Sequence, residues 1–95
     1  MAGFDWDEVK NRLNVEKHGV SFDQAQRICD DRILVVIDPR SYSEVRWIGI
    51  GRIDPAAVLT VVFTERRDRR RLISARPASR KERKRYDEAL QEADE

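Results

Sequence analysis

The chain has 95 residues and a formal net charge of +1, with 39% charged and 40% hydrophobic residues. This length suffices for one hydrophobic core but not for two, so we expect a single domain over residues 1–95. The longest apolar runs, residues 33–37 and 61–63, are far shorter than a membrane-spanning helix, and the first residues lack the basic and apolar regions of a secretion signal. We therefore expect a cytoplasmic protein with no membrane partner.

Cysteine usage argues against both a disulfide and a zinc site. The single cysteine, Cys29, has no second cysteine to pair with and no CxxC motif or histidine neighbour. It lies on the apolar side of a predicted helix, where a buried small side chain is the expected role and a reactive thiol is the alternative. The sequence therefore implies no metal and no other cofactor.

Two short helices are predicted in the first third of the chain. The first begins at a cap formed by Asp5 or Asp7 and ends at Gly19, and its apolar positions at helical spacing are Trp6, Val9 and Leu13. The second begins at a capping box between Ser21 and Gln24. Its predicted buried stripe consists of Phe22, Ala25, Ile28 and Cys29.

A sheet and a third helix follow. Strand composition marks residues 32–37, 45–51, 58–64 and 71–76, and residues 4–6 form either a short strand or an extended lead-in. The connections are too short for crossover helices, so neighbouring strands should be antiparallel. The last helix begins at Ser79 in a capping box with Glu82. The predicted fold class is α+β: an antiparallel sheet of four to five strands with two N-terminal helices and one C-terminal helix.

Charge is segregated along the chain. Between Thr64 and Tyr86 there are 11 Lys or Arg residues against 3 Asp or Glu, a local balance of +8, so the rest of the chain carries 1 − 8 = −7. Such a dense block of cations indicates a surface that binds a polyanion, because each cation near a phosphate releases counterions.

The charges of the last helix are reversed relative to its dipole. Basic residues occupy its start, and acidic residues, including Glu95, occupy its end, although the opposite order is the stabilising one. This arrangement fits a helix start that normally meets an anion, and a merely solvated charged helix is the alternative. The basic residues of this start are Arg80, Lys81, Arg83, Lys84 and Arg85.

The turn before the last strand is dense in arginine. Arginine contacts phosphate oxygens in pairs and stacks on unpaired bases, which suits single-stranded or irregular RNA. No aromatic residue lies in this turn, which favours contact with the backbone over base readout. The alternatives are a role in solubility or an acidic protein partner. The candidate RNA-binding residues of the turn and helix are Arg67, Arg69, Arg70, Arg71, Lys81 and Arg83.

The end of the last strand places two arginines near one helix start. Arg76 and Arg80, with helix N–H groups, are expected to converge on one phosphate, as a metal-free phosphoryl-transfer site requires. Cleavage through the 2′-hydroxyl of RNA also needs a base and an acid. The available groups are His18, Lys17, Glu65 and Tyr86. At a helix C-terminus, His18 favours a structural role, with a catalytic role as the alternative.

Several motifs together resemble the BrnT toxin family. They are Phe4–Asp7, residues 17–22 (KHGVSF), residues 48–52 (IGIGR), residues 64–66 (TER) and residues 73–83 (ISARPASRKER), which occur in the family's order and spacing over nearly the whole chain. One departure is Ile28–Cys29, where family members often have an aromatic residue at the end of the second helix.

The resemblance implies a RelE-like fold and a metal-independent endoribonuclease that arrests translation. It also implies inhibition by a BrnA antitoxin. Operator DNA would be contacted only indirectly, through this antitoxin. The family's motif arginines fall on Arg66, Arg76 and Arg80. Two other hypotheses stay open: a non-catalytic nucleic-acid-binding module, and an interaction domain whose basic segment docks an acidic partner.

Overall fold

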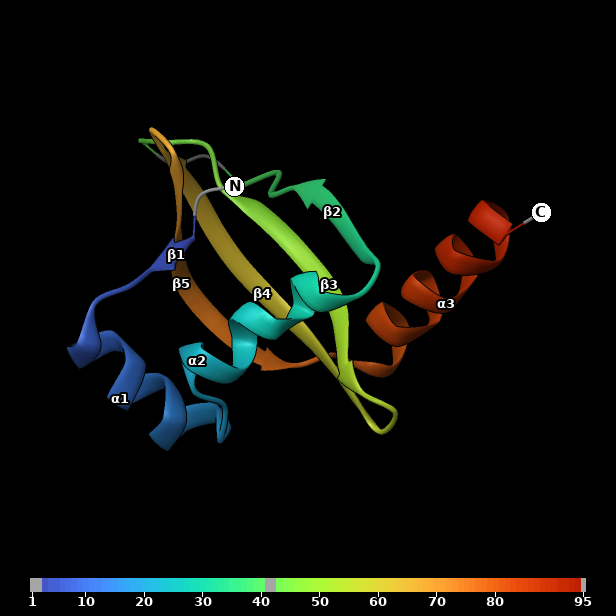
Figure 1. The fold of residues 1–95 in the computed structure, drawn as a ribbon, viewed down its shortest axis with the longest axis horizontal. Coiled ribbons are helices and arrows are strands. Elements are labelled where there is room, and N and C mark those ends of the chain that lie inside the picture. Colours follow the sequence, from blue (N-terminus) through green and yellow to red (C-terminus); the bar gives the residue numbers. More distant parts are fainter. Residues whose placement is uncertain (1–2, 41–42, 95) are drawn as a thin grey trace.

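The computed structural model describes residues 3–40 and 43–94, so the sequence position Glu95 lies outside the described residues. One five-stranded sheet has the order β1-β5-β4-β3-β2, with α2 and the 3-10 helix η1 on one side and α3 on the other. Helix α1 lies next to β5, beside the sheet (Figure 1). None of the described helices is both long and apolar enough to span a membrane.

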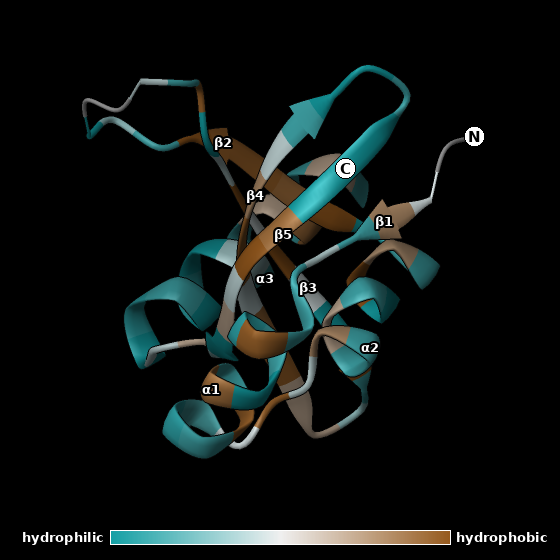
Figure 2. Ribbon diagram, turned by 90° about the vertical axis from the view of Figure 1, so that its left-hand side faces the viewer, coloured by the Kyte–Doolittle hydropathy of each residue, from teal (hydrophilic) through white to brown (hydrophobic). Residues whose placement is uncertain are grey.

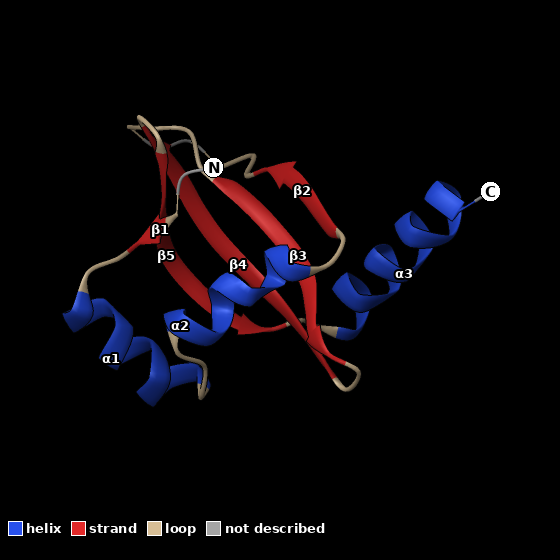
Figure 3. Cartoon of the chain, viewed as in Figure 1, coloured by secondary structure: helices blue, strands red, loops and turns tan. Residues whose placement is uncertain are grey.

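Four strands form antiparallel hairpins, as the short connections predict. They are β2 (Ile33–Ile37), β3 (Trp47–Asp54), β4 (Ala57–Arg66) and β5 (Arg69–Pro77). The lead-in forms a short edge strand, β1 (Phe4–Asp5), which pairs in parallel with β5. The α+β class with two N-terminal helices and one C-terminal helix is confirmed, and Figure 3 shows these elements by type.

Helix α1 (Glu8–His18) begins and ends as predicted but packs differently. Asp7 caps it by accepting the N–H groups of Val9 and Lys10, and the φ of Gly19 at its end is 72°. The apolar side chains of Val9 and Leu13 are 55% and 57% exposed, so no apolar stripe holds this helix to the sheet.

A buried amide attaches α1 instead. The side chain of Asn14 donates to the carbonyl oxygens of Val20 (2.8 Å) and Ala75 (2.7 Å), and it accepts the N–H of Ala75 at 3.2 Å. Because Asn14 is only 7% exposed, these hydrogen bonds lie away from solvent, where losing a partner is costly.

Helix α2 (Phe22–Ala25) and η1 (Gln26–Asp30) cover one side of the sheet with three of the four residues of the predicted stripe, and the fourth, Cys29, is only partly buried. The capping box between Ser21 and Gln24 is present, and Phe22, Ala25 and Ile28 are buried. Ile28 approaches β3 so closely that a Cβ on Gly51 would lie 2.7 Å from the Ile28 Cβ. A glycine at position 51 therefore permits this packing.

Helix α3 (Arg80–Asp94) covers only one end of the opposite side. Tyr86 is 1% exposed, packs with Ile50 and Val58, and donates its hydroxyl to the Arg32 carbonyl at 2.7 Å. Acidic residues of α3 also pair with Arg32, which directly precedes β2, and with Arg52 of β3, at Arg32–Asp94 (2.6 Å) and Arg52–Asp87 (3.5 Å). The acidic end of this helix is thus partly explained by its attachment to the sheet.

Candidate functional site

The side of the sheet opposite α2 and η1 carries the site, and we call it the open face. Val61 and Phe63 point into the core beneath α2, so the alternate residues of β4 point to the open face. The β5 residues on the same face are identified from the β4–β5 register, which shifts at the bulge between Val62 and Phe63. The open-face residues are Thr60, Val62, Thr64 and Arg66 on β4 with Arg69, Arg71, Ser74 and Arg76 on β5.

A small polar cavity lies at the β4–β5 hairpin end of this face, and we call it the hairpin pocket. Its volume is about 50 Å³. The ionisable residues that line it are four cations and two carboxylates: Lys10, Arg46, Arg66, Arg71, Asp7 and Glu44. Figure 2 shows the hairpin at this end as strongly hydrophilic, in contrast to the apolar middle of the sheet.

Ion pairs hold two of the pocket's arginines. Arg66 lies at the end of β4 and contacts the Glu44 carboxylate at 3.3 Å. Arg71 contacts Asp5 of β1 at 3.3 Å, which the parallel pairing of β1 with β5 makes possible. The backbone N–H groups of Lys10 and Val9 lower the pKa of Asp7, which keeps this helix cap ionised. The pocket therefore has four cations against two carboxylates, of which Asp7 caps α1 and Glu44 contacts Arg66.

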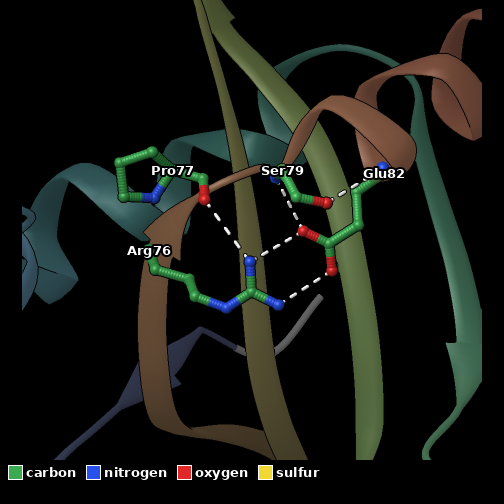
Figure 4. A network of polar contacts seen from close by, with 4 residues as sticks. All are labelled: Arg76, Pro77, Ser79 and Glu82. Atoms are coloured by element: carbon green, nitrogen blue, oxygen red, sulfur yellow. Dashed lines mark hydrogen bonds and ion pairs between the residues drawn. The ribbon is translucent and has the colours of Figure 1, made fainter.

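A second charged group lies at the other end of the open face. The Arg76 guanidinium donates to both oxygens of Glu82, at 2.7 and 2.8 Å, and also contacts the Pro77 carbonyl at 3.4 Å (Figure 4). Glu82 accepts the Ser79 N–H at 2.8 Å, and the Ser79 hydroxyl accepts the Glu82 N–H at 3.2 Å, which confirms the predicted capping box.

Arg76 changes the acidity of its partner. Its hydrogen bonds lower the pKa of Glu82 from 4.5 to about 2, against an opposing effect of partial burial. The same hydrogen bonds raise the pKa of Arg76. The sequence predicts a phosphate at Arg76, and the structure places a carboxylate there.

The predicted catalytic residues do not form one cluster. Arg76 pairs in register with Thr60, six positions before Arg66 on β4, and a strand rises about 3.3 Å per residue, so Arg66 and Arg76 lie about 20 Å apart. Arg80 is exposed in the first turn of α3, at the Arg76 end. One phosphate cannot contact both Arg66 and Arg76.

The two predicted proton-transfer residues on α1 lie away from the hairpin pocket. His18 is partly buried and follows Asn14 by one turn, so it lies on the side of α1 that meets β5 near Ala75. Lys17 is exposed beside it. The pocket is lined by the opposite end of α1, at Asp7 and Lys10.

The predicted RNA-binding residues divide between two faces. Arg69 and Arg71 are on the open face, and Arg67 is in the hairpin turn with a φ of 53°. Lys81 and Arg83 are exposed near the start of α3.

Arg70 turns to the core side of the sheet. Its guanidinium lies 5.2 Å from the centre of the Phe63 ring and contacts the Cys29 Sγ at 3.7 Å and Glu65 at 3.9 Å. Burial raises the pKa of the Cys29 thiol despite the nearby Arg70 charge, which favours its protonated form. These contacts give Arg70 a packing role.

Sequence reasoning misses five charged residues of these two groups: Asp7, Lys10, Glu44, Arg46 and Glu82. Asp7 and Glu82 carry a signal as predicted helix caps, but that signal concerns the helices rather than the neighbouring arginines. Among residues 3–40 and 43–94, no three His, Cys, Asp or Glu side chains are grouped so as to hold a metal ion.

The fold and these two groups define a small α+β protein with cationic groups at both ends of one open sheet face. A family model described as "Ribonuclease toxin, BrnT, of type II toxin-antitoxin system" matches residues 6–82, and the chain therefore belongs to this family. The chain is also similar in fold to the crystal structure of the Brucella abortus ribonuclease toxin BrnT. The TM-score is 0.64 at 24% identity, over 84% of this chain and 100% of that one. No curated protein matches the sequence.

Proposed function

We propose that this chain is an endoribonuclease that cleaves RNA through the substrate's own 2′-hydroxyl, without a metal ion, and thereby inhibits translation. The observation that carries the proposal is the hairpin pocket, which four cations line together with the Asp7 and Glu44 carboxylates, and where Glu44 contacts Arg66 at 3.3 Å. An RNA phosphate is the ligand that such a group attracts, and membership of a ribonuclease toxin family supports that choice. An RNA substrate also favours the cytoplasm as the compartment.

The pocket supplies a group for each chemical step. Glu44 accepts the proton of the 2′-hydroxyl, and the freed oxygen attacks the adjacent phosphorus. Arg66, Arg46 and Arg71 stabilise the negative charge that develops on the phosphate oxygens. The bond to the 5′-oxygen breaks, and that oxygen takes a proton from Lys10. The products are a 2′,3′-cyclic phosphate and a 5′-hydroxyl.

The far end of the open face binds a neighbouring part of the strand. An extended RNA that has one phosphate in the hairpin pocket reaches Arg76 and Arg80 about 20 Å away. His18 and Lys17 remain proton-transfer candidates only for chemistry at this second end. The exposed Lys81 and Arg83 extend the cationic surface beyond it.

An antitoxin partner fits the same surface. An acidic segment of a BrnA-like antitoxin would neutralise the open-face cations and exclude RNA, so inhibition requires no other site. Operator DNA would then be contacted through the antitoxin. Interaction with an acidic protein alone is the alternative, and it predicts a stable complex with the antitoxin but no retention of RNA at low salt.

The test is incubation of the partner-free protein with end-labelled single-stranded RNA in EDTA, with product ends resolved on a gel. We expect cleavage that leaves 2′,3′-cyclic phosphate ends and that is lost in Arg66→Ala. Arg12→Ala, on the exposed side of α1, is the matched control and should cleave normally. Retention of RNA without new ends would favour a non-catalytic binding module instead.

A further inference from the structure

Glu82 holds Arg76 in the geometry that a phosphate would use. Carboxylate and phosphate both accept two parallel N–H bonds from one guanidinium, and Glu82 accepts such a pair at 2.7 and 2.8 Å. The same carboxylate also accepts the Ser79 N–H at the start of α3 (Figure 4). Arg76 therefore already contacts an anion of this chain.

The pair is accessible to a competing anion. The Arg76 side chain is 42% exposed and the Glu82 side chain 23% exposed, and Arg76 lies on the open face rather than in the core. A competing anion can thus replace Glu82 at Arg76 through a movement of the Glu82 side chain, without opening of the fold.

The surrounding charges make the position of Glu82 informative. It is the one acidic residue of the sequence between Ser79 and Tyr86, where five residues are Lys or Arg. If Glu82 served only to cap α3, its contacts with Ser79 would be sufficient. The additional two-pronged contact with Glu82 neutralises Arg76, which lies on the open face.

We propose that Glu82 is an internal competitor for Arg76, so that RNA must displace this carboxylate before Arg76 can bind a phosphate. The inference rests on the proposed function, because it takes RNA as the competing ligand. Glu82 then weakens RNA binding at the α3 end of the open face and does not touch the reacting phosphate in the hairpin pocket.

Glu82→Gln is the informative variant. Glutamine can still accept the Ser79 N–H and complete the capping box, but it leaves the Arg76 charge available to a phosphate. Since an exposed ion pair contributes little, we expect RNA affinity to rise by about two- to fivefold. The slope of log affinity against log salt should steepen by about 0.7, the contribution of one phosphate contact on a single strand.

The experiment measures binding of a 2′-O-methyl RNA oligonucleotide, which cannot be cleaved through its 2′ position, by fluorescence anisotropy at several salt concentrations. The proteins are the wild type, Glu82→Gln, Arg76→Ala and the double variant, each checked for its fold by circular dichroism. Glu88→Gln makes the same charge change at an exposed position of α3 and controls for net charge.

Tighter binding by Glu82→Gln that disappears in the Arg76→Ala background would support the inference. Equal or weaker binding by Glu82→Gln, or a gain that persists without Arg76 or equals that of Glu88→Gln, would overturn it while leaving RNA binding intact. If the wild type and Glu82→Gln both fail to bind, the RNA-binding function itself fails and the inference with it.

Discussion

Arg66 and Arg76 lie on the same face of the sheet, and the β4–β5 pairing keeps them about 20 Å apart. Arg66 borders the hairpin pocket and contacts Glu44, whereas Arg76 is paired with Glu82 beside α3. A single extended ligand can meet both residues, but a single phosphate cannot. The two arginines should therefore contribute to different kinetic constants.

Replacing each of these arginines separately tests this division. Arg66→Ala removes a donor to the reacting phosphate and should lower kcat by about 100-fold or more. Arg76→Ala removes a ground-state contact and should raise KM with little change in kcat. Steady-state cleavage of a short labelled RNA measures both constants. A loss of kcat in Arg76→Ala as large as in Arg66→Ala would place the chemistry at the α3 end instead.

Glu44 offers a sharper test of the proposed chemistry. Glu44→Gln keeps the size of the side chain and a contact to Arg66 but cannot accept the 2′-hydroxyl proton. We expect kcat to fall by about 100- to 10,000-fold, with RNA affinity unchanged or slightly increased. Single-turnover cleavage and anisotropy on the same protein separate the two effects. Full activity in Glu44→Gln would exclude this residue as the base.

The sequence predicts the elements that residues close together in the chain determine, namely the helix caps and the strands. Both capping boxes and the four antiparallel strands are where spacing and β-branched runs indicate them. The apolar spacing of Val9 and Leu13 misleads, because a polar residue, Asn14, supplies the contact between α1 and the sheet. The spacing of apolar residues cannot reveal that the buried Asn14 side chain hydrogen-bonds to the backbone of β5.

The candidate site depends on contacts between distant segments. Lys10, Glu44 and Arg66 belong to three separate segments, and they meet because β1 joins the edge of β5 and the loop before β3 folds over the hairpin end. Glu82 reaches Arg76 across the turn between β5 and α3. Neither arrangement follows from residue spacing, which explains why the arginines of the basic block are predicted, whereas Lys10, Arg46 and the acidic residues beside them are not.

Asn14 gives a prediction about stability. Asn14→Ala leaves the buried N–H and C=O groups of Ala75 and the Val20 carbonyl without their amide partner, which should cost about 3 kcal/mol in the free energy of unfolding. Urea denaturation measures this change. Val9→Ala removes an exposed apolar side chain of the same helix and should change stability by less than about 0.5 kcal/mol. Similar losses in the two variants would contradict the polar attachment of α1.

The pH dependence of stability tests the Arg76–Glu82 pair in the free protein. Folding depresses the pKa of Glu82 from 4.5 to about 2, so the ionised carboxylate contributes its full stabilisation above pH 4.5 and loses it as the pH falls toward 2. Glu82→Gln has no such group. The difference in unfolding free energy between wild type and Glu82→Gln should therefore be constant from pH 5 to 8 and shrink between about pH 4.5 and 2. Chemical denaturation across this range measures it, with Glu88→Gln as the control. A difference that stays constant down to pH 2 would mean that Arg76 does not hold Glu82 in its ionised form.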